Sequence, residues 1–250
     1  MAVFKIALIN ELEKLYKKKK ALAAIVFSLA VIILGQLAIW GVRAGFGIRG
    51  AGGGEFPLLI LSVVIKTVLP LFVALAAIDS FSGEFSRNII RVTLTRPVSR
   101  FKIFSAKVVA AAIFILLNLL SIFFLSILIS LFFNYKSLTV TGVASTFWAY
   151  MVSLLPLLVL VLGVILLAHL LKSGLAVFFA AVLLFLASEL LALILPQYAG
   201  LFITSHLGWY KLWLAHTFPL AAVLRKLLLM LGSGVMLFVG SFYLFERKEF

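Results

Sequence analysis

The chain has 250 residues, of which 65% are hydrophobic and only 12% are charged, with a mean hydropathy of +1.27. Because soluble domains carry about 25% charged residues, this composition excludes an ordinary soluble protein and indicates an integral membrane protein. A net charge of +14 would suggest nucleic-acid binding in a soluble chain. Here the basic residues separate apolar segments, so we expect contacts with membrane lipids and no nucleic-acid partner. No segment is long enough to fold alone outside the membrane, so residues 1–250 are expected to form one membrane domain.

The first segment, residues 1–20, is expected to be an amphipathic helix from about residue 3 onwards. Its apolar side chains repeat at helical spacing on one stripe, formed by Phe4, Leu8, Leu12 and Leu15. The charged side chains are expected elsewhere on the helix: Lys5, Glu11, Glu13, Lys14 and Lys17. The helix is too polar to span a bilayer, so we expect it to lie in the membrane interface. A solvated tail is the alternative.

The apolar runs that follow are long enough to cross a bilayer, which takes about 20 residues. They lie near residues 21–42, 56–78, 108–133, 147–171, 174–195 and 224–245. An even number of spans places both ends of the chain on one side of the membrane. The prediction is therefore an all-α integral membrane protein with six transmembrane helices.

The distribution of Lys and Arg predicts which side that is. With the N-terminus in the cytoplasm, fifteen of the 22 basic residues fall in cytoplasmic segments and six in outer segments, while Lys66 lies within a span. The positive-inside rule therefore predicts cytoplasmic termini, in a multi-pass protein of the plasma membrane. Trp40, Trp148, Trp209 and Trp213 then fall at outer ends of spans or in an outer loop, as expected for anchoring at the membrane surface.

Residues 196–223, before the last span, are aromatic, amphipathic in places and too broken to cross the membrane. We expect short re-entrant helices here on the outer side, which requires that their ends are buried in protein or hydrated. The histidines are scattered, without a carboxylate at metal-ligand spacing, so we predict no metal site and no catalytic site. The chain is not expected to be an enzyme.

Two ionisable residues, Lys66 and Glu189, are predicted to lie inside the membrane, at similar depths in the outer halves of the second and fifth spans. A lone charge at such a depth costs at least about 2.5–3.5 kcal/mol, which mutual pairing or contact with a wet cavity would offset. Two interpretations stay open. The residues line or gate a pathway, or they form a buried structural pair or extend their charged ends to the membrane interface.

The most basic segment is the loop expected at residues 79–107, between the second and third spans. From residue 83 it contains six basic residues and a single acid, Glu84. Candidate caps for a short helix that enters the loop are Asp79, Ser80 and Ser82. Pro97 is expected to end that helix, and Ser99 to cap the helix that leads into the third span. Such a compact bend would transmit force when another protein holds it.

This loop contains Glu84, then a basic and aliphatic stretch, then the turn Arg96-Pro97-Val98-Ser99-Arg100, and finally Lys107. The order resembles the signature loop of ABC transporter permeases of the second, exporter-type class. In that family an acidic residue precedes a Gly-Thr pair, a helix, a Pro-Val/Ile-Ser-Arg turn and a lysine. Asn88-Ile89 stand where Gly-Thr is usual. The N-terminal helix, the six spans and the broken segment before the last span extend the resemblance over the whole chain.

The resemblance implies a permease subunit of an ATP-driven exporter, in which two permeases, two copies or a paralogue pair, form the substrate pathway. Separate ABC ATPase subunits would bind ATP and Mg²⁺, because these 250 residues contain no GxxxxGK[ST] phosphate-binding loop and are expected to bind no cofactor. Residues 79–107 would be the cytoplasmic coupling segment, residues 1–20 the connecting helix, and residues 196–223 the outer gate. Contacts with the ATPase are implied for Glu84, Arg87, Arg91, Arg96, Pro97, Val98, Ser99 and Arg100.

The resemblance also implies that the second and fifth spans, with Lys66 and Glu189, line the path. Two alternatives remain. One is a secondary transporter or channel without an ATPase, which would use this pair as an ion relay. The other is a non-transporting immunity or sensory membrane partner with the same fold.

Overall fold

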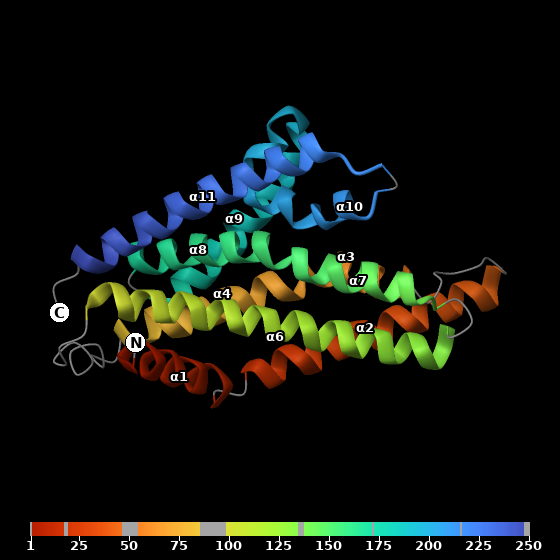
Figure 1. Ribbon diagram of the computed structural model, residues 1–250, viewed down its shortest axis with the longest axis horizontal. Coiled ribbons are helices and arrows are strands. Elements are labelled where there is room, and N and C mark those ends of the chain that lie inside the picture. Colours follow the sequence, from red (N-terminus) through yellow and green to blue (C-terminus); the bar gives the residue numbers. More distant parts are fainter. Residues whose placement is uncertain are drawn as a thin grey trace.

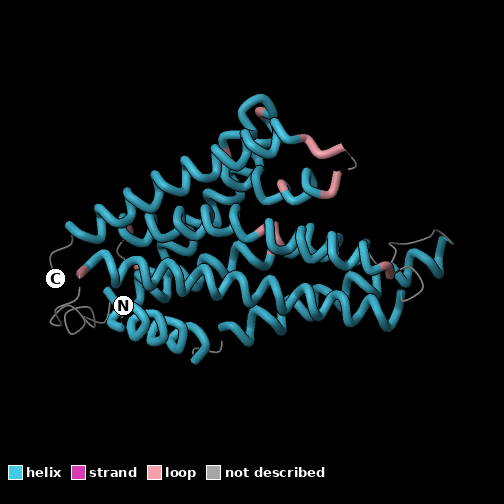
Figure 2. Tube along the Cα trace, in the orientation of Figure 1, coloured by secondary structure: helices cyan, strands magenta, loops and turns pink. Residues whose placement is uncertain are grey.

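The computed structural model describes residues 2–17, 20–46, 55–85, 99–134, 138–171, 173–215 and 217–247. The regular elements in these ranges are all helices (Figure 2). In chain order they are α1 (Ala2–Lys17), α2 (Lys20–Phe46), α3 (Glu55–Val64), α4 (Val68–Phe85), α6 (Arg100–Asn134), α7 (Val140–Val152), α8 (Leu154–Leu170), α9 (Gly174–Ile194), the 3-10 helices η2 (Pro196–Leu201) and η3 (Ile203–Gly208), α10 (Tyr210–Trp213) and α11 (Leu220–Arg247).

The membrane spans agree with the prediction. Five stretches of helix are long and apolar enough to cross a bilayer, and α3 with α4 makes a sixth if this bent pair counts as one span. The five are Leu22–Gly41, Arg100–Phe133, Val140–Leu170, Gly174–Ile194 and Leu220–Arg247. The third, fourth and sixth begin earlier than predicted, because residues assigned to the preceding loops continue the helices. The all-helical membrane fold is confirmed.

Most helices run along the long axis of the molecule, while α11 crosses the bundle obliquely (Figure 1). At one end α1 packs against α6, and the Arg100 guanidinium at the start of α6 donates a hydrogen bond to the Glu246 carbonyl in the last turn of α11. We call this the terminal end of the bundle. The described residues nearest both termini therefore lie on one side, as the predicted even number of spans requires.

The second span is broken at residues 65–67, where α3 and α4 meet at 47°. Pro70 explains the break. It lacks the N–H that would bond to the carbonyl of Lys66, and its ring clashes with that carbonyl. The Thr67 hydroxyl donates to the Val63 carbonyl at 2.8 Å, and the backbone N–H groups of Lys66 and Thr67 donate to the same oxygen. Lys66 therefore lies at the bend between α3 and α4. An unbroken helix would direct its side chain differently.

The fourth span is interrupted in the same way between α7 and α8. Pro156 cannot donate to the carbonyl of Val152, and the indole Nε1 of Trp209 donates to that oxygen instead, at 2.9 Å. Trp209 is only 2% exposed. The prediction that this tryptophan anchors the protein at the membrane surface is therefore wrong. Its ring is buried and donates its hydrogen bond at the Pro156 break. Trp40 and Trp148 are exposed, as predicted.

We expect Trp209→Phe to lower the stability of the fold by about 1–3 kcal/mol, because it leaves the partly buried Val152 carbonyl without the indole hydrogen bond. Trp213→Phe is the matched control, since its buried Nε1 has no hydrogen-bond partner among the described residues. The measurement is the thermal unfolding midpoint of each variant in detergent. Equal midpoints for the two variants would show that the hydrogen bond contributes nothing.

The core is built around α8, which packs against α4, α6 and α11. Leu157, Ile165 and Ala168 of this helix are at most 1% exposed. The N-terminal helix α1 joins the bundle through Leu15, which is buried with Ala76, Ala110 and Phe114, while Leu8 and Leu12 pack against the same cluster. The predicted amphipathic helix and its apolar stripe are present, and the stripe faces protein. A solvated tail does not fit this packing.

Candidate functional site

The two predicted intramembrane charges come together. Lys66 Nζ lies 3.0 Å from Glu189 Oε2, although the residues are 123 positions apart. Lys66 projects from the α3–α4 break, and Glu189 from the second half of α9. The lysine side chain is 48% exposed and the glutamate side chain 32%. The two charges are therefore paired with each other, and both side chains remain partly exposed on the surface of this chain.

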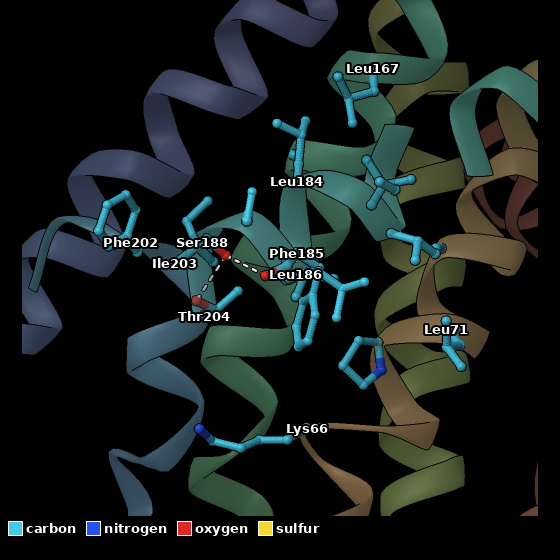
Figure 3. Close-up of a pocket in the computed structure, with 18 of the residues that line it drawn as sticks. Lys66, Leu71, Leu167, Leu184, Phe185, Leu186, Ser188, Phe202, Ile203 and Thr204 are labelled. Atoms are coloured by element: carbon cyan, nitrogen blue, oxygen red, sulfur yellow. Dashed lines mark hydrogen bonds between the residues drawn. The ribbon is translucent and has the colours of Figure 1, made fainter. Parts of the chain in front are cut away.

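Lys66 also lies at one end of a cavity of about 720 Å³ between α4, α8, α9 and residues 201–204. Figure 3 shows Lys66 at one end and Leu167 at the other. The walls are mostly aliphatic and are contributed by three helices that approach each other closely elsewhere. Gly163 and Ala181 are small residues of the walls, and a Cβ at Gly163 would come within 4.0 Å of Leu237 of α11. A volume of this size is within the range of small-molecule sites.

The hydroxyl groups of the cavity are already satisfied within the protein. Ser188 Oγ lies 2.8 Å from the Phe185 carbonyl oxygen and 3.0 Å from Thr204 Oγ1, as the dashed lines in Figure 3 mark. This contact joins α9 to η3, a short helix of the segment predicted to be re-entrant. Lys66 is the one charged group among the described lining residues. The polar groups of a ligand in this cavity would therefore have to contact Lys66 and its partner Glu189.

A second charged cluster lies at the terminal end, where α1, α4 and α6 meet. The buried Lys107 ammonium donates to the Ser80 carbonyl at 2.7 Å, and Nζ lies 3.2 Å from Glu11 Oε1. The same nitrogen lies 5.7 Å from the centre of the Phe81 ring. Lys14 also pairs with Glu11, at 2.8 Å. One lysine thus ties the N-terminal helix to the two helices that lead to and from residues 86–98.

The burial of Glu11 corrects an expectation. Glu11 was expected to lie away from the apolar stripe, but it is 7% exposed, and its partner Lys107 is 2% exposed. The helical spacing contained the signal. Glu11 is three residues after Leu8 and four before Leu15, which puts it on the packed face. A complementary lysine on α6 makes burial of this carboxylate tolerable.

The predicted loop at residues 79–107 is helical at both described ends. α4 continues to Phe85, so Asp79, Ser80 and Ser82 do not cap a new helix. α6 begins at Arg100, directly after Ser99, and Phe104 is fully buried against Phe81, Phe238 and Phe245. Burial of these aromatic rings extends α6 beyond the apolar run that marked its span. The basic residues Arg100, Lys102 and Lys107 made residues 100–107 look like part of a loop, so this packing was not predicted.

Most of the residues predicted to contact an ATPase cannot be placed. Arg87, Arg91, Arg96, Pro97 and Val98 lie outside the described residues, and so does the side chain of Glu84. Ser99 accepts backbone hydrogen bonds from Lys102 and Ile103 in the first turn of α6. Arg100 reaches the end of α11.

His206, in η3, is buried beneath the segment that precedes α11. Burial lowers its pKa, and the nearby charge of Lys226 lowers it further, while a hydrogen bond with the Gly200 backbone acts in the opposite direction. The folded state therefore disfavours the protonated imidazole of His206. Three-residue groups of His, Asp and Glu that could hold a metal are absent from the described parts of the chain.

The lowered pKa of His206 predicts a dependence of stability on pH. Because the unfolded state takes up the proton more readily than the folded state, stability falls as the pH drops below the unfolded pKa of about 6.5. His206→Gln should remove this loss. Unfolding midpoints of both proteins between pH 8 and pH 5 test it, and parallel curves would assign the pH dependence to other groups.

A comparison with protein-family models identifies residues 7–188 as an ABC-2 family transporter protein. The chain belongs to the ABC-2 transporter family. A search of curated proteins found no match. The matched part of this ABC-2 permease contains Glu11, Lys66 and Lys107, and it ends one residue before Glu189.

Membership of the ABC-2 family makes the chain a transmembrane transport permease, one component of a system that includes an ABC ATPase subunit. The permease is a multi-pass membrane protein. Its cavity and its two charged clusters are thus features of a transport component. The family itself is a membrane component of transport and not an enzyme.

Proposed function

We propose that this ABC-2 permease is the membrane subunit of an ATP-driven exporter. Two permeases, either two copies or this chain with a paralogue, form the substrate pathway, and separate ATPase subunits bind ATP and Mg²⁺. The single observation that carries the proposal is the family match over residues 7–188. The resemblance of the Arg96–Arg100 turn supports the exporter class.

The proposed orientation places the terminal end of the bundle in the cytoplasm, in the plasma membrane. The excess of basic residues in the segments assigned to that side supports it. In this orientation residues 79–107 meet the ATPase, and η2, η3 and α10 lie at the outer side, where they close the pathway as short re-entrant helices. The α1 helix rests on the inner membrane surface as a connecting helix.

Coupling between ATPase and pathway is supported by the cluster around Lys107. A force on residues 86–98 acts on the ends of α4 and α6, and Lys107 holds these ends to each other and to α1. At its other end α4 meets α3 at the Pro70 break, which carries Lys66. A movement of α4 therefore reaches the cavity. In this mechanism ATP binding shifts the population between inward-open and outward-open arrangements.

The Lys66–Glu189 pair favours a second candidate, an ion-coupled secondary transporter, since intramembrane charge pairs commonly serve ion relays. Affinity purification of the tagged chain from native membranes, followed by mass spectrometry of the intact complex, separates the two. We expect a nucleotide-binding subunit and a second permease in the complex. A chain that purifies without an ATPase and still transports would support the secondary transporter.

A further inference from the structure

The cavity beside Lys66 has chemically different ends. At one end lies Lys66, and the other end, near Leu167 and Leu184, is aliphatic (Figure 3). The Lys66 ammonium pairs with Glu189, which is not itself among the described lining residues. The lining residues run from Lys66, in the break before α4, to Ala74 of α4, and along α9 from Ala181 to Leu191. These stretches correspond to about 12–15 Å along a helix. The cavity is therefore elongated and carries its charge at one end. It matches an elongated molecule with a charged head and an apolar tail.

We propose that this cavity binds a zwitterionic amphiphile, a lipid-like molecule whose head carries both a phosphate and a primary ammonium group. The aliphatic walls take the acyl chain, and the ion pair takes the head. If the bound amphiphile is also the transported substrate, that part of the inference rests on the proposed transport function. Binding itself requires no ATPase.

The charge of the head follows from the charge of the site. Lys66 and Glu189 neutralise each other, so an anionic head that takes Lys66 leaves the Glu189 carboxylate unpaired. An unpaired charge beside apolar walls is costly. A neutral head leaves the pair closed and gains nothing from it. A head with both charges replaces each partner of the pair with an opposite charge, so that neither protein group loses its counterion.

The geometry of the pair allows this exchange. Lys66 Nζ has three N–H donors, and its contact with Glu189 uses one of them. Both side chains are partly exposed, so a head group reaches them without displacing buried protein. The hydroxyls of Ser188 and Thr204 bond to each other in the absence of a ligand, which leaves the ion pair as the polar anchor.

Lipids that carry a photoreactive acyl chain test the proposal on the purified full-length chain. The probes are phosphatidylethanolamine, phosphatidylglycerol and diacylglycerol with identical chains, and cross-linked residues are mapped by mass spectrometry. We expect adducts on the aliphatic walls, at Leu71, Leu167 or Leu184. Phosphatidylethanolamine should label these positions about fivefold more than the other two lipids, as partly exposed charge pairs allow.

Variants separate the head from the chain. Lys66→Met and Glu189→Gln should each lower phosphatidylethanolamine labelling about fivefold, while the exchange Lys66→Glu with Glu189→Lys retains the preference because both charges remain. Ala187→Phe, on the cavity wall, should lower labelling by all three probes. Ala176→Phe, an exposed position of α9 away from the described lining, is the matched control and should change none.

Equal labelling by the three lipids, or full labelling of Lys66→Met, would overturn the assignment of the head group. Labelling that Ala187→Phe leaves unchanged would overturn the site. Association with an ATPase is measured separately on the same preparation before the probes are added. A complex that retains its ATPase but shows no lipid preference would refute the ligand class and leave the proposed transport function standing.

Discussion

Lys107→Met should lower the stability of the permease by about 3 kcal/mol and abolish ATP-driven transport. Removal of one partner from a buried ion pair costs about 3–5 kcal/mol, because the other charge stays buried without compensation. Lys14 still pairs with Glu11 in this variant, so the lower end of that range applies. The Ser80 carbonyl also loses its donor. The measurements are the unfolding midpoint in detergent and transport in proteoliposomes with the ATPase.

The control for this variant is Lys102→Met, on the same helix, since Lys102 is exposed. It should unfold at the same midpoint as the wild type, which makes it the control for the stability measurement. The double variant Glu11→Gln with Lys107→Met should recover part of the stability, because no charge is then left buried alone. It should not recover transport, since α1 is no longer tied to α6. Normal transport by a stable double variant would contradict the role of this cluster in coupling.

Arg91→Glu should uncouple ATP hydrolysis from transport while the protein remains inserted in the membrane. Arg91 lies in the segment proposed to meet the ATPase, and opposite charges across such an interface set its register and orientation. Like charges placed opposite each other cost several kcal/mol in such an interface. We expect transport to fall at least tenfold, and stimulation of the ATPase by the permease to be lost.

Arg91 is preferable to Arg100 for this test, although both lie in the proposed coupling segment. Arg100 also holds the Glu246 carbonyl of α11, so its reversal disturbs the permease itself. Arg49→Glu is the control, a reversal in the segment between the first two spans, which the proposed orientation puts on the outer side. A stimulated ATPase and unchanged transport in Arg91→Glu would count against docking through this residue.

The spans could be predicted from the sequence because membrane insertion depends on the hydropathy of local apolar runs, and this hydropathy is a property of the sequence alone. The meeting of Lys66 and Glu189 could also be anticipated. Their depths follow from residue counts along the two spans, and a lone charge at that depth is expensive. The bend that positions Lys66 follows from Pro70, four residues later.

Other features depend on contacts between distant segments, which local patterns do not record. The indole of Trp209 finds the carbonyl freed by Pro156 only after the chain has folded back on α7. Phe104 extends α6 because rings from α4 and α11 surround it. Glu11 was an intermediate case. Its helical position indicated burial, but only Lys107, nearly a hundred residues later, explains why a carboxylate is tolerated there.

The central claim is that this permease moves its substrate only when a separate ATPase acts on residues 79–107. Transport should be measured in proteoliposomes that contain the purified permease with and without its ATPase, at equal amounts of permease. We predict ATP-dependent transport with the ATPase present and none without it. Full transport by the permease alone would contradict the claim.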